Sequence, residues 1–162
     1  MDIYLSDIIQ ILIRVTVAGI LGGLIGYERR LHHKAVGVAG MTLIAIGSST
    51  FMLLATHLQN SDPASISRTV QGMLSGIGFL GGAVIFKSGT DVRGIKTAAA
   101  VWITGAIGLA IGTSAWWLGI LVGVVTLALL FVADRFPDPV REMDQEESSA
   151  DDADETAPPQ RN

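Results

Sequence analysis

The sequence contains no cysteine, little charge and few aromatic residues. Without cysteine there are no disulfides and no thiolate metal sites, although this absence identifies no cellular compartment. Only 16% of the residues are charged and 6% are aromatic, whereas 49% are hydrophobic and the mean hydropathy is +0.49. No nucleophile, general base and orienting group occur together, and no pair of carboxylates lies within an apolar segment. The composition therefore predicts a membrane protein that is not an enzyme.

Long apolar runs are abundant. About 20 residues of helix cross the ~30 Å hydrocarbon core of a bilayer, so a run of about 18 or more with few charges is a candidate span. We predict an all-α bundle of five transmembrane helices, within a domain covering residues 1–139. The first run is expected to be retained rather than cleaved, because acids stand where a signal peptide has basic residues. The predicted spans are residues 8–27, 37–56, 69–86, 95–112 and 115–133.

Charge is distributed unevenly along the chain. Three alternate connections carry nearly all of the Lys and Arg, and the cytoplasmic side of a membrane protein is the basic side. The N-terminus is therefore predicted outside and the C-terminus in the cytoplasm. Residues 140–162 are acidic and nearly free of apolar side chains, so we expect a disordered tail. The eight basic residues on the predicted inner side are Arg29, Arg30, Lys34, Lys87, Arg93, Lys96, Arg135 and Arg141, against Arg68 alone on the other.

Two glycine patterns resemble nucleotide-binding motifs. Gly76, Gly78 and Gly81 have the G-x-G-x-x-G spacing, but no strand precedes them and no acid follows about 20 residues later. The segment around Gly94 and Lys96 approaches a phosphate loop, except that Ile95 separates glycine from lysine. Nucleotide binding is therefore not expected.

Small residues four apart instead let membrane helices approach closely. Four of the five spans carry such glycine pairs, and the third span has the densest set. We interpret the glycines as packing residues and expect the third span near the centre of the bundle. A broken third helix that lines a site within the membrane is the functional alternative. The pairs are Gly19/Gly23, Gly22/Gly26, Gly72/Gly76, Gly78/Gly82, Gly108/Gly112 and Gly119/Gly123.

Polar groups at membrane depth often mark function. Arg14 is the one charge well inside a span, and its side chain either extends outward towards Asp7 or contacts an anion or a partner. Glu28, at the inner end of the first span, is expected to pair with Arg29, Arg30 or Lys96. Serine and threonine within the spans, namely Ser48, Ser49, Thr50, Ser75 and Thr104, are predicted to form hydrogen bonds between helices. The adjacent His32 and His33 are interpreted as surface residues, because neighbours on a helix do not chelate one metal readily.

Three segments together resemble the signature of the MgtC/SapB family of bacterial inner-membrane proteins: "GGLIGYERRLHHKAVG", "RTVQGMLSGIGFLGGAVIF" and "VRGIKTAAAVWITGAIGLAIG". The resemblance covers about residues 19–112. Some family members carry a folded cytoplasmic C-terminal domain, where this chain has the acidic tail. Together with Arg14 from the charge argument, the motif positions implied here as functional or packing residues are Gly26, Glu28, Arg29, Arg68, Gly76, Gly78, Phe79, Gly81, Arg93, Gly94, Thr97, Ala98, Ala99 and Trp102.

The resemblance implies a virulence-associated protein linked to growth in low magnesium, to survival in host cells and to restraint of the ATP synthase. We expect a non-enzymatic modulator of magnesium homeostasis or of a membrane partner such as the ATP synthase. The alternative is a transporter or channel subunit for magnesium or another small ion. Magnesium favours carboxylate ligands in octahedral geometry, and no carboxylate lies deep in a span, which disfavours a magnesium pore through one chain. An oligomer, however, could gather rings of Glu28 or Asp62 at the openings of a shared pore. We expect no cofactor and no nucleic acid; the lipid bilayer, another membrane protein or further copies of the chain are the candidate partners.

Overall fold

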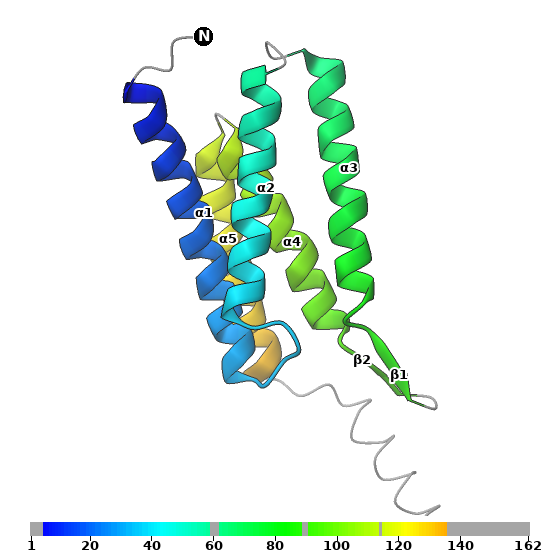
Figure 1. Ribbon diagram of the computed structural model, residues 1–162. Helices are drawn as coiled ribbons and strands as arrows, with labels where there is room; N and C mark the ends of the chain where they lie inside the picture. The colour runs from blue at the N-terminus through cyan, green and yellow to red at the C-terminus, as the bar shows by residue number, and fades with distance from the viewer. Residues whose placement is uncertain (1–4, 59–61, 89–90, 114, 136–162) are drawn as a thin grey trace, which may run out of the picture. The chain divides into compact units, whose positions relative to one another are not determined.

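The computed structural model describes residues 5–58, 62–88, 91–113 and 115–135. Within these ranges the chain forms five helices and one short hairpin (Figure 1). The strands β1 (Phe86–Ser88) and β2 (Asp91–Arg93) are antiparallel, with Lys87 opposite Val92. The helices are α1 (Leu5–Leu31), α2 (Val38–Leu58), α3 (Pro63–Gly82), α4 (Ile95–Gly112) and α5 (Trp116–Arg135).

The chain divides into two compact units, residues 1–130 and 131–162. The first unit contains α1 to α4 and most of α5. In the second unit the structure describes only the last turns of α5, residues 131–135. The predicted acidic tail, residues 140–162, and the domain boundary at residue 139 lie outside the described residues.

Four of the five predicted spans agree closely with the observed helices, and α4 has the predicted bounds. The third prediction is wrong at both ends, because the helix begins six residues earlier than expected and ends at Gly82. The early start has a local cause. Asp62 is the N-cap and accepts a 3.0 Å hydrogen bond from the Ser65 amide, and Pro63 occupies the first turn, where its missing N–H costs nothing.

Two membrane-length helices, α2 and α4, pack side by side with their chains running in the same direction. Gly108 lies against Ala45 and Ser48, and four residues later Gly112 lies against Ser49 and Met52. Four of the described helices, α1, α2, α4 and α5, are long and apolar enough to cross a membrane, whereas α3 is not by that measure. Two parallel spans nevertheless require a return crossing between them. Since α3 is the helix that joins the end of α2 to the hairpin before α4, it makes that crossing, and the described helices cross five times.

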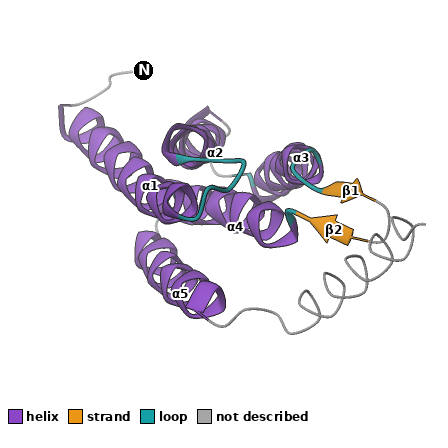
Figure 2. Cartoon of the chain, turned by 90° about the horizontal axis from the view of Figure 1, so that it is seen from below, coloured by secondary structure: helices purple, strands orange, loops and turns teal. Residues whose placement is uncertain are grey.

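The expectation that the third span lies at the centre is wrong, because α4 has that position. Figure 2 shows α4 between α1 and α3, and α4 also packs along α2. Ten residues of α4 are buried, whereas α3 buries only Ile77 and Gly81. The number of glycines in a helix did not identify the central one, since most glycines of α3 have no neighbour to pack against.

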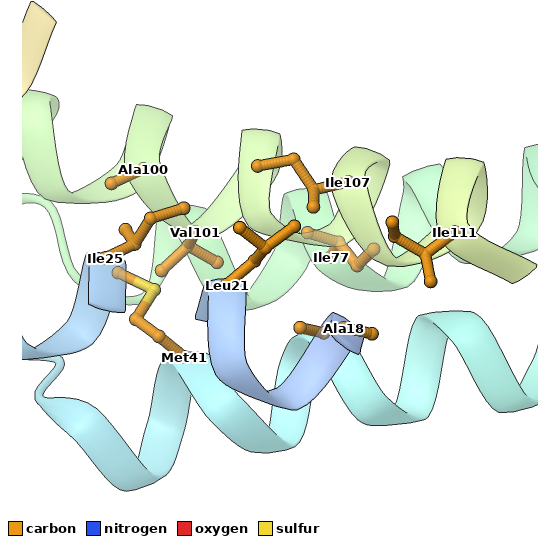
Figure 3. Close-up of a cluster of buried hydrophobic side chains, with 10 residues drawn as sticks. Ala18, Leu21, Ile25, Met41, Ile77, Ala100, Val101, Ile107 and Ile111 are labelled. Carbon is orange, nitrogen blue, oxygen red and sulfur yellow. The ribbon is translucent and has the colours of Figure 1, made fainter. Parts of the chain in front are cut away.

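The core is formed by apolar side chains from α1, α2, α3 and α4. Figure 3 shows Ile25 of α1 close to Val101 and Ala100 of α4, with Met41 of α2 beside them. Ile77 of α3 enters the same cluster and fills the space above Gly105 of α4. Close backbone approach makes this packing possible, as expected for helices that lack a hydrophobic driving force between them in lipid.

Candidate functional site

The candidate site lies where α1 ends, and its centre is a buried ion pair between neighbouring residues. Arg29 Nε donates to Glu28 Oε2 at 2.5 Å, and Arg29 Nη2 donates to Glu28 Oε1 at 2.6 Å. Arg29 is 0% exposed and Glu28 is 9% exposed. Of the three partners expected for Glu28, the structure selects Arg29. A paired guanidinium and carboxylate satisfy each other in a planar, two-bond geometry, which lowers the cost of removing both charges from water.

His32 adds a second contact to the same carboxylate. One turn after Glu28, its Nδ1 lies 3.1 Å from Glu28 Oε1 and 3.0 Å from the Glu28 backbone oxygen. The imidazole is 39% exposed, so it forms the solvent-facing edge of the Glu28–Arg29–His32 cluster. Oε2 of Glu28 is therefore bound by Arg29, and Oε1 is shared between Arg29 and His32.

His33 ends α1 in a conformation that glycine usually adopts. Its φ is +53°, its amide donates to Arg30 O, and the Lys34 amide donates to Arg29 O. These two hydrogen bonds are the Schellman arrangement, in which the residue after the helix takes the left-handed conformation. Histidine is among the non-glycine residues that tolerate it. The two histidines thus have different roles, since His32 contacts Glu28 and His33 turns the chain.

Glycine at position 26 fixes the place of this cluster relative to α2. A Cβ at Gly26 would lie 2.6 Å from Val38 Cα and 2.8 Å from the Gly37 carbonyl oxygen, both backbone atoms. Only glycine permits this approach, so α2 begins directly beside the last buried turn of α1. The motif position Gly26 is therefore explained by packing.

The start of α4 reaches the same end of the bundle. Gly94 is the N-cap with φ of +92°, and a Cβ there would collide with the Val84 carbonyl oxygen. Thr97 in the first turn is buried, and Arg93 before it is exposed. A Cβ on Gly81 would lie 3.4 Å from the Ala98 carbonyl oxygen, so the end of α3 packs beside this turn. Ile25 of α1 contacts Ala100 and Val101 of α4 in the core. Glu28, which follows Ile25, and Thr97, which precedes Ala100, therefore lie towards the same end of the bundle.

Arg14 lies towards the other end of the bundle and has a role that neither sequence interpretation anticipated. Its Nη1 donates to the Gly112 carbonyl oxygen at 3.1 Å and to the Thr113 carbonyl oxygen at 2.9 Å. These carbonyls end α4, where helices leave acceptors unsatisfied and carry a partial negative charge. The Arg14 guanidinium thus binds the end of α4, rather than extending towards Asp7 as expected. Arg14 is the C-terminal cap of α4.

The remaining motif residues do not join the cluster. On α3, Arg68 is exposed and donates to Ser65 Oγ at 3.2 Å, and Phe79 is 79% exposed. Gly76 and Gly78 have no atom within 4 Å of a built Cβ. Trp102 on α4 is 47% exposed. The helix is continuous through Gly82, so the alternative of a broken third helix is wrong.

Hydroxyl groups within the spans form fewer bonds between helices than expected. Thr104 Oγ1 donates to Ala100 O in its own helix at 2.7 Å and lies 3.6 Å from Met41 Sδ of α2. Thr50 donates to Ile46 O, also within its helix. The hydroxyls of Ser48 and Ser49 are buried without a hydrogen-bond partner in the described structure. The prediction of helix-to-helix hydrogen bonds is therefore wrong for both serines.

The chemistry of the cluster does not fit a metal centre. No group of three or more His, Cys, Asp or Glu side chains that could hold a metal ion occurs among the described residues. Glu28, the buried carboxylate of the cluster, has its oxygens occupied by Arg29 and His32. The arrangement fixes the charges of Glu28 and Arg29 where α1 ends beside the start of α2, which suits a structural role or contact with a partner.

Comparison with known proteins identifies relatives. The family model described as the MgtC family matches residues 15–138. A protein named MgtC from Brucella abortus is 38% identical over 115 residues, covering 71% of this chain and 45% of that protein. The SrpB protein of Synechococcus elongatus is 34% identical over 137 residues, covering 77% and 75%. An Escherichia coli K12 protein named "Putative magnesium transporter YhiD" is 34% identical over 129 residues, covering 76% and 60%. The chain spans about half the length of the first of these relatives, and no solved structure matches.

Proposed function

Because this chain belongs to the MgtC family, we propose that it is a multi-pass protein of the bacterial cell membrane that modulates magnesium homeostasis. It acts through its residues at the end of α1 and the start of α4, on ion balance or on a membrane partner such as the ATP synthase. It is not an enzyme in this proposal. The names of its relatives support the link to magnesium, and the geometry supports modulation over transport.

The state of Glu28 is the observation that carries this proposal. A magnesium site needs oxygen ligands in near-octahedral geometry at about 2.1 Å. Both Glu28 oxygens are already bound by the Arg29 guanidinium, and His32 approaches one of them. Releasing the carboxylate for a cation would break this buried two-bond ion pair, which costs about 3–5 kcal/mol in comparable pairs. Among the described residues, a single copy therefore offers magnesium no free carboxylate at this depth.

The orientation in the membrane forms part of the same proposal. Basic residues gather where α1 ends and α4 begins, and an odd number of crossings is consistent with chain ends on opposite sides of the membrane. The excess of Lys and Arg supports placing that end in the cytoplasm and the N-terminus outside. The basic residues of the described chain at this end are Arg29, Arg30, Lys34, Lys87, Arg93 and Lys96.

Two measurements test the proposal together. A bacterium that lacks its own copy of this gene is grown in low-magnesium medium with the wild-type chain or with a chain ending at Pro139. Purified protein is then placed in liposomes that contain a magnesium-sensitive dye. We expect growth to be restored and no magnesium entry beyond that of empty liposomes, with a magnesium ionophore as the positive control. Unaltered growth of the deletion strain would remove the link to magnesium.

A transporter or channel subunit is the second candidate. The exposed polar side chains of α3, Gln71 and Ser75, support it, because polar groups within a bilayer often line an ion path. Under this alternative, magnesium enters the liposomes, and Gln71→Leu abolishes the entry without reducing the amount of reconstituted protein. Entry that depends on Gln71 would refute modulation as the sole activity.

A further inference from the structure

Helix α3 has one packed face and one polar face. Ile77, Gly81 and partly buried Met73 face the bundle. At 100° per residue, the opposite side of the helix carries Gln71 and Ser75 among glycines. We call this side the open face of α3; all of its members are exposed, and they are Arg68, Gln71, Gly72, Ser75, Gly76, Gly78, Phe79 and Gly82.

Contact with lipid is unfavourable for this face, because it carries polar side chains. Gln71 and Ser75 lie on either side of Met73, which packs against the core, so both are at the depth of the bundle interior. Gln71 Nε2 donates to Ser67 Oγ at 3.4 Å, a long contact that uses one of its two N–H groups. Polar groups without partners in hydrocarbon cost several kcal/mol each. This polar face also explains why α3 alone among the five helices falls short of the apolarity of a membrane span.

No described part of the chain fills the space beside the glycines of this face either. A Cβ built on Gly22, Gly108 or Gly119 would collide with a neighbouring helix. Built on Gly72, Gly76, Gly78 or Gly82 it would have no atom within 4 Å. Most glycines of α1, α4 and α5 are thus used inside the bundle, whereas Gly72, Gly76, Gly78 and Gly82 of α3 leave unfilled space beside the two polar side chains.

We propose that the open face of α3 binds the same face of a second copy of this chain. Copies inserted in the same direction and related by an axis along the membrane normal bring identical residues to the same depth. A glutamine amide and a serine hydroxyl both donate and accept hydrogen bonds, so Gln71 pairs with Gln71 and Ser75 with Ser75. The glycines let the two backbones approach closely enough for these short side chains to meet.

The charges at the outer end of α3 are compatible with this symmetric pairing. Arg68 is exposed and stands near the start of the helix, where its long side chain reaches water. Asp62, at the N-cap, contributes the opposite charge within the same segment; hydrogen bonds from Ser65 lower the pKa of Asp62, and the attraction of Arg68 adds a smaller lowering. Two copies therefore bring acids and bases of equal number to this end, rather than a single sign of charge.

The absence of cysteine makes the interface directly testable. Ser75→Cys introduces a single thiol on the open face, and Leu43→Cys introduces one on α2 at a position that is 68% exposed. Membranes containing each full-length variant at equal abundance are treated with copper phenanthroline and oxygen, which oxidise two close thiols to a disulfide. We expect a disulfide-linked dimer for Ser75→Cys and the monomer for Leu43→Cys. Equal cross-linking of both variants would indicate random collision and overturn the proposal, as would none at Ser75.

A second variant separates assembly from folding. Gly72→Leu adds a side chain where the protomer has nothing within 4 Å, so the fold of one copy tolerates it, whereas a second α3 would be pushed away. In polymer nanodiscs formed directly from membranes, mass photometry should find wild type as a dimer and Gly72→Leu as a monomer of unchanged helicity. A monomeric wild type, or a Gly72→Leu variant that remains dimeric, would overturn the interface. A particle containing one copy and a different protein would also overturn it.

Discussion

Gly22 offers a quantitative test of how the bundle is held together. It lies on α1, where a Cβ would come 2.6 Å from the Met41 carbonyl oxygen and 2.7 Å from the Ala45 Cβ of α2. Ordinary contacts begin near 3.4 Å, so alanine at this position must move the two helices apart by about 0.8 Å. The opposing atoms are backbone and a Cβ, which cannot rotate away. Overpacking of this kind costs about 1–3 kcal/mol.

The matched control is Gly47→Ala on α2, where a Cβ has nothing within 4 Å. Both substitutions gain the same helix propensity, about 1 kcal/mol, because both replace glycine inside a helix. The difference between the two variants therefore isolates the steric contribution. Unfolding in mixed micelles with increasing dodecyl sulfate, followed by tryptophan fluorescence and circular dichroism, should show Gly22→Ala less stable than Gly47→Ala by about 1–3 kcal/mol. Equal midpoints for the two variants would refute the view that α1 and α2 pack through their backbones.

Four other predictions follow from local contacts. Arg14→Ala should destabilise the fold by about 1.5–3 kcal/mol, because charge-assisted hydrogen bonds to two carbonyls are lost. Arg14→Lys should retain part of this stability, and equal destabilisation by the two variants in the same micelle assay would contradict the capping role. His33→Gly should raise stability by about 1–2 kcal/mol by relieving a left-handed conformation, and a lower midpoint than wild type would contradict that assignment. Glu28→Gln should cost about 3–5 kcal/mol because it removes the charged half of a buried two-bond ion pair with Arg29. Arg30→Gln, at an exposed neighbouring position, should change stability little, and similar midpoints for both variants would refute the importance of the pair. Asp62→Ala should weaken the first turn of α3 because the helix loses its N-cap, measured as faster amide exchange in that turn. The Ser65 side-chain and backbone hydrogen bonds lower the pKa of Asp62 in the folded protein. The stability that its charge contributes is therefore fully present above the unfolded pKa, near 3.9, and is lost as pH falls through the lower folded pKa. If the stability difference between wild type and Asp62→Ala grew as the pH was lowered, this sign would be contradicted.

The positions of the helices were largely readable from the sequence, because apolar runs of membrane length have few alternative structures. The bounds of α4 follow directly from Gly94 before it and Gly112 at its end. The start of α3 was missed because its first turn is polar, even though Asp62 followed by Pro63 is a start signal. The hairpin was missed because strands of three residues are too short to show alternation.

The partners of individual residues were less predictable. The pairing of Glu28 with a basic neighbour could be inferred, since one candidate was adjacent in the chain. The role of Arg14 could not, because its acceptors are backbone atoms near residue 112 and every residue has a carbonyl. Glycine spacing showed that helices would pack closely, but it could not show that Gly22 has a partner inside the protomer and that Gly72 has none.

The cap formed by Arg14 also constrains the order in which the protein is made. Its acceptors, the carbonyls of Gly112 and Thr113, lie 98 and 99 residues further along the chain. At about 5–20 residues per second, a ribosome needs about 5–20 s to synthesise that stretch. During this interval the newly inserted first helix carries a guanidinium without its final acceptors, so it must stay near the membrane surface or beside the insertion machinery until the fourth helix arrives.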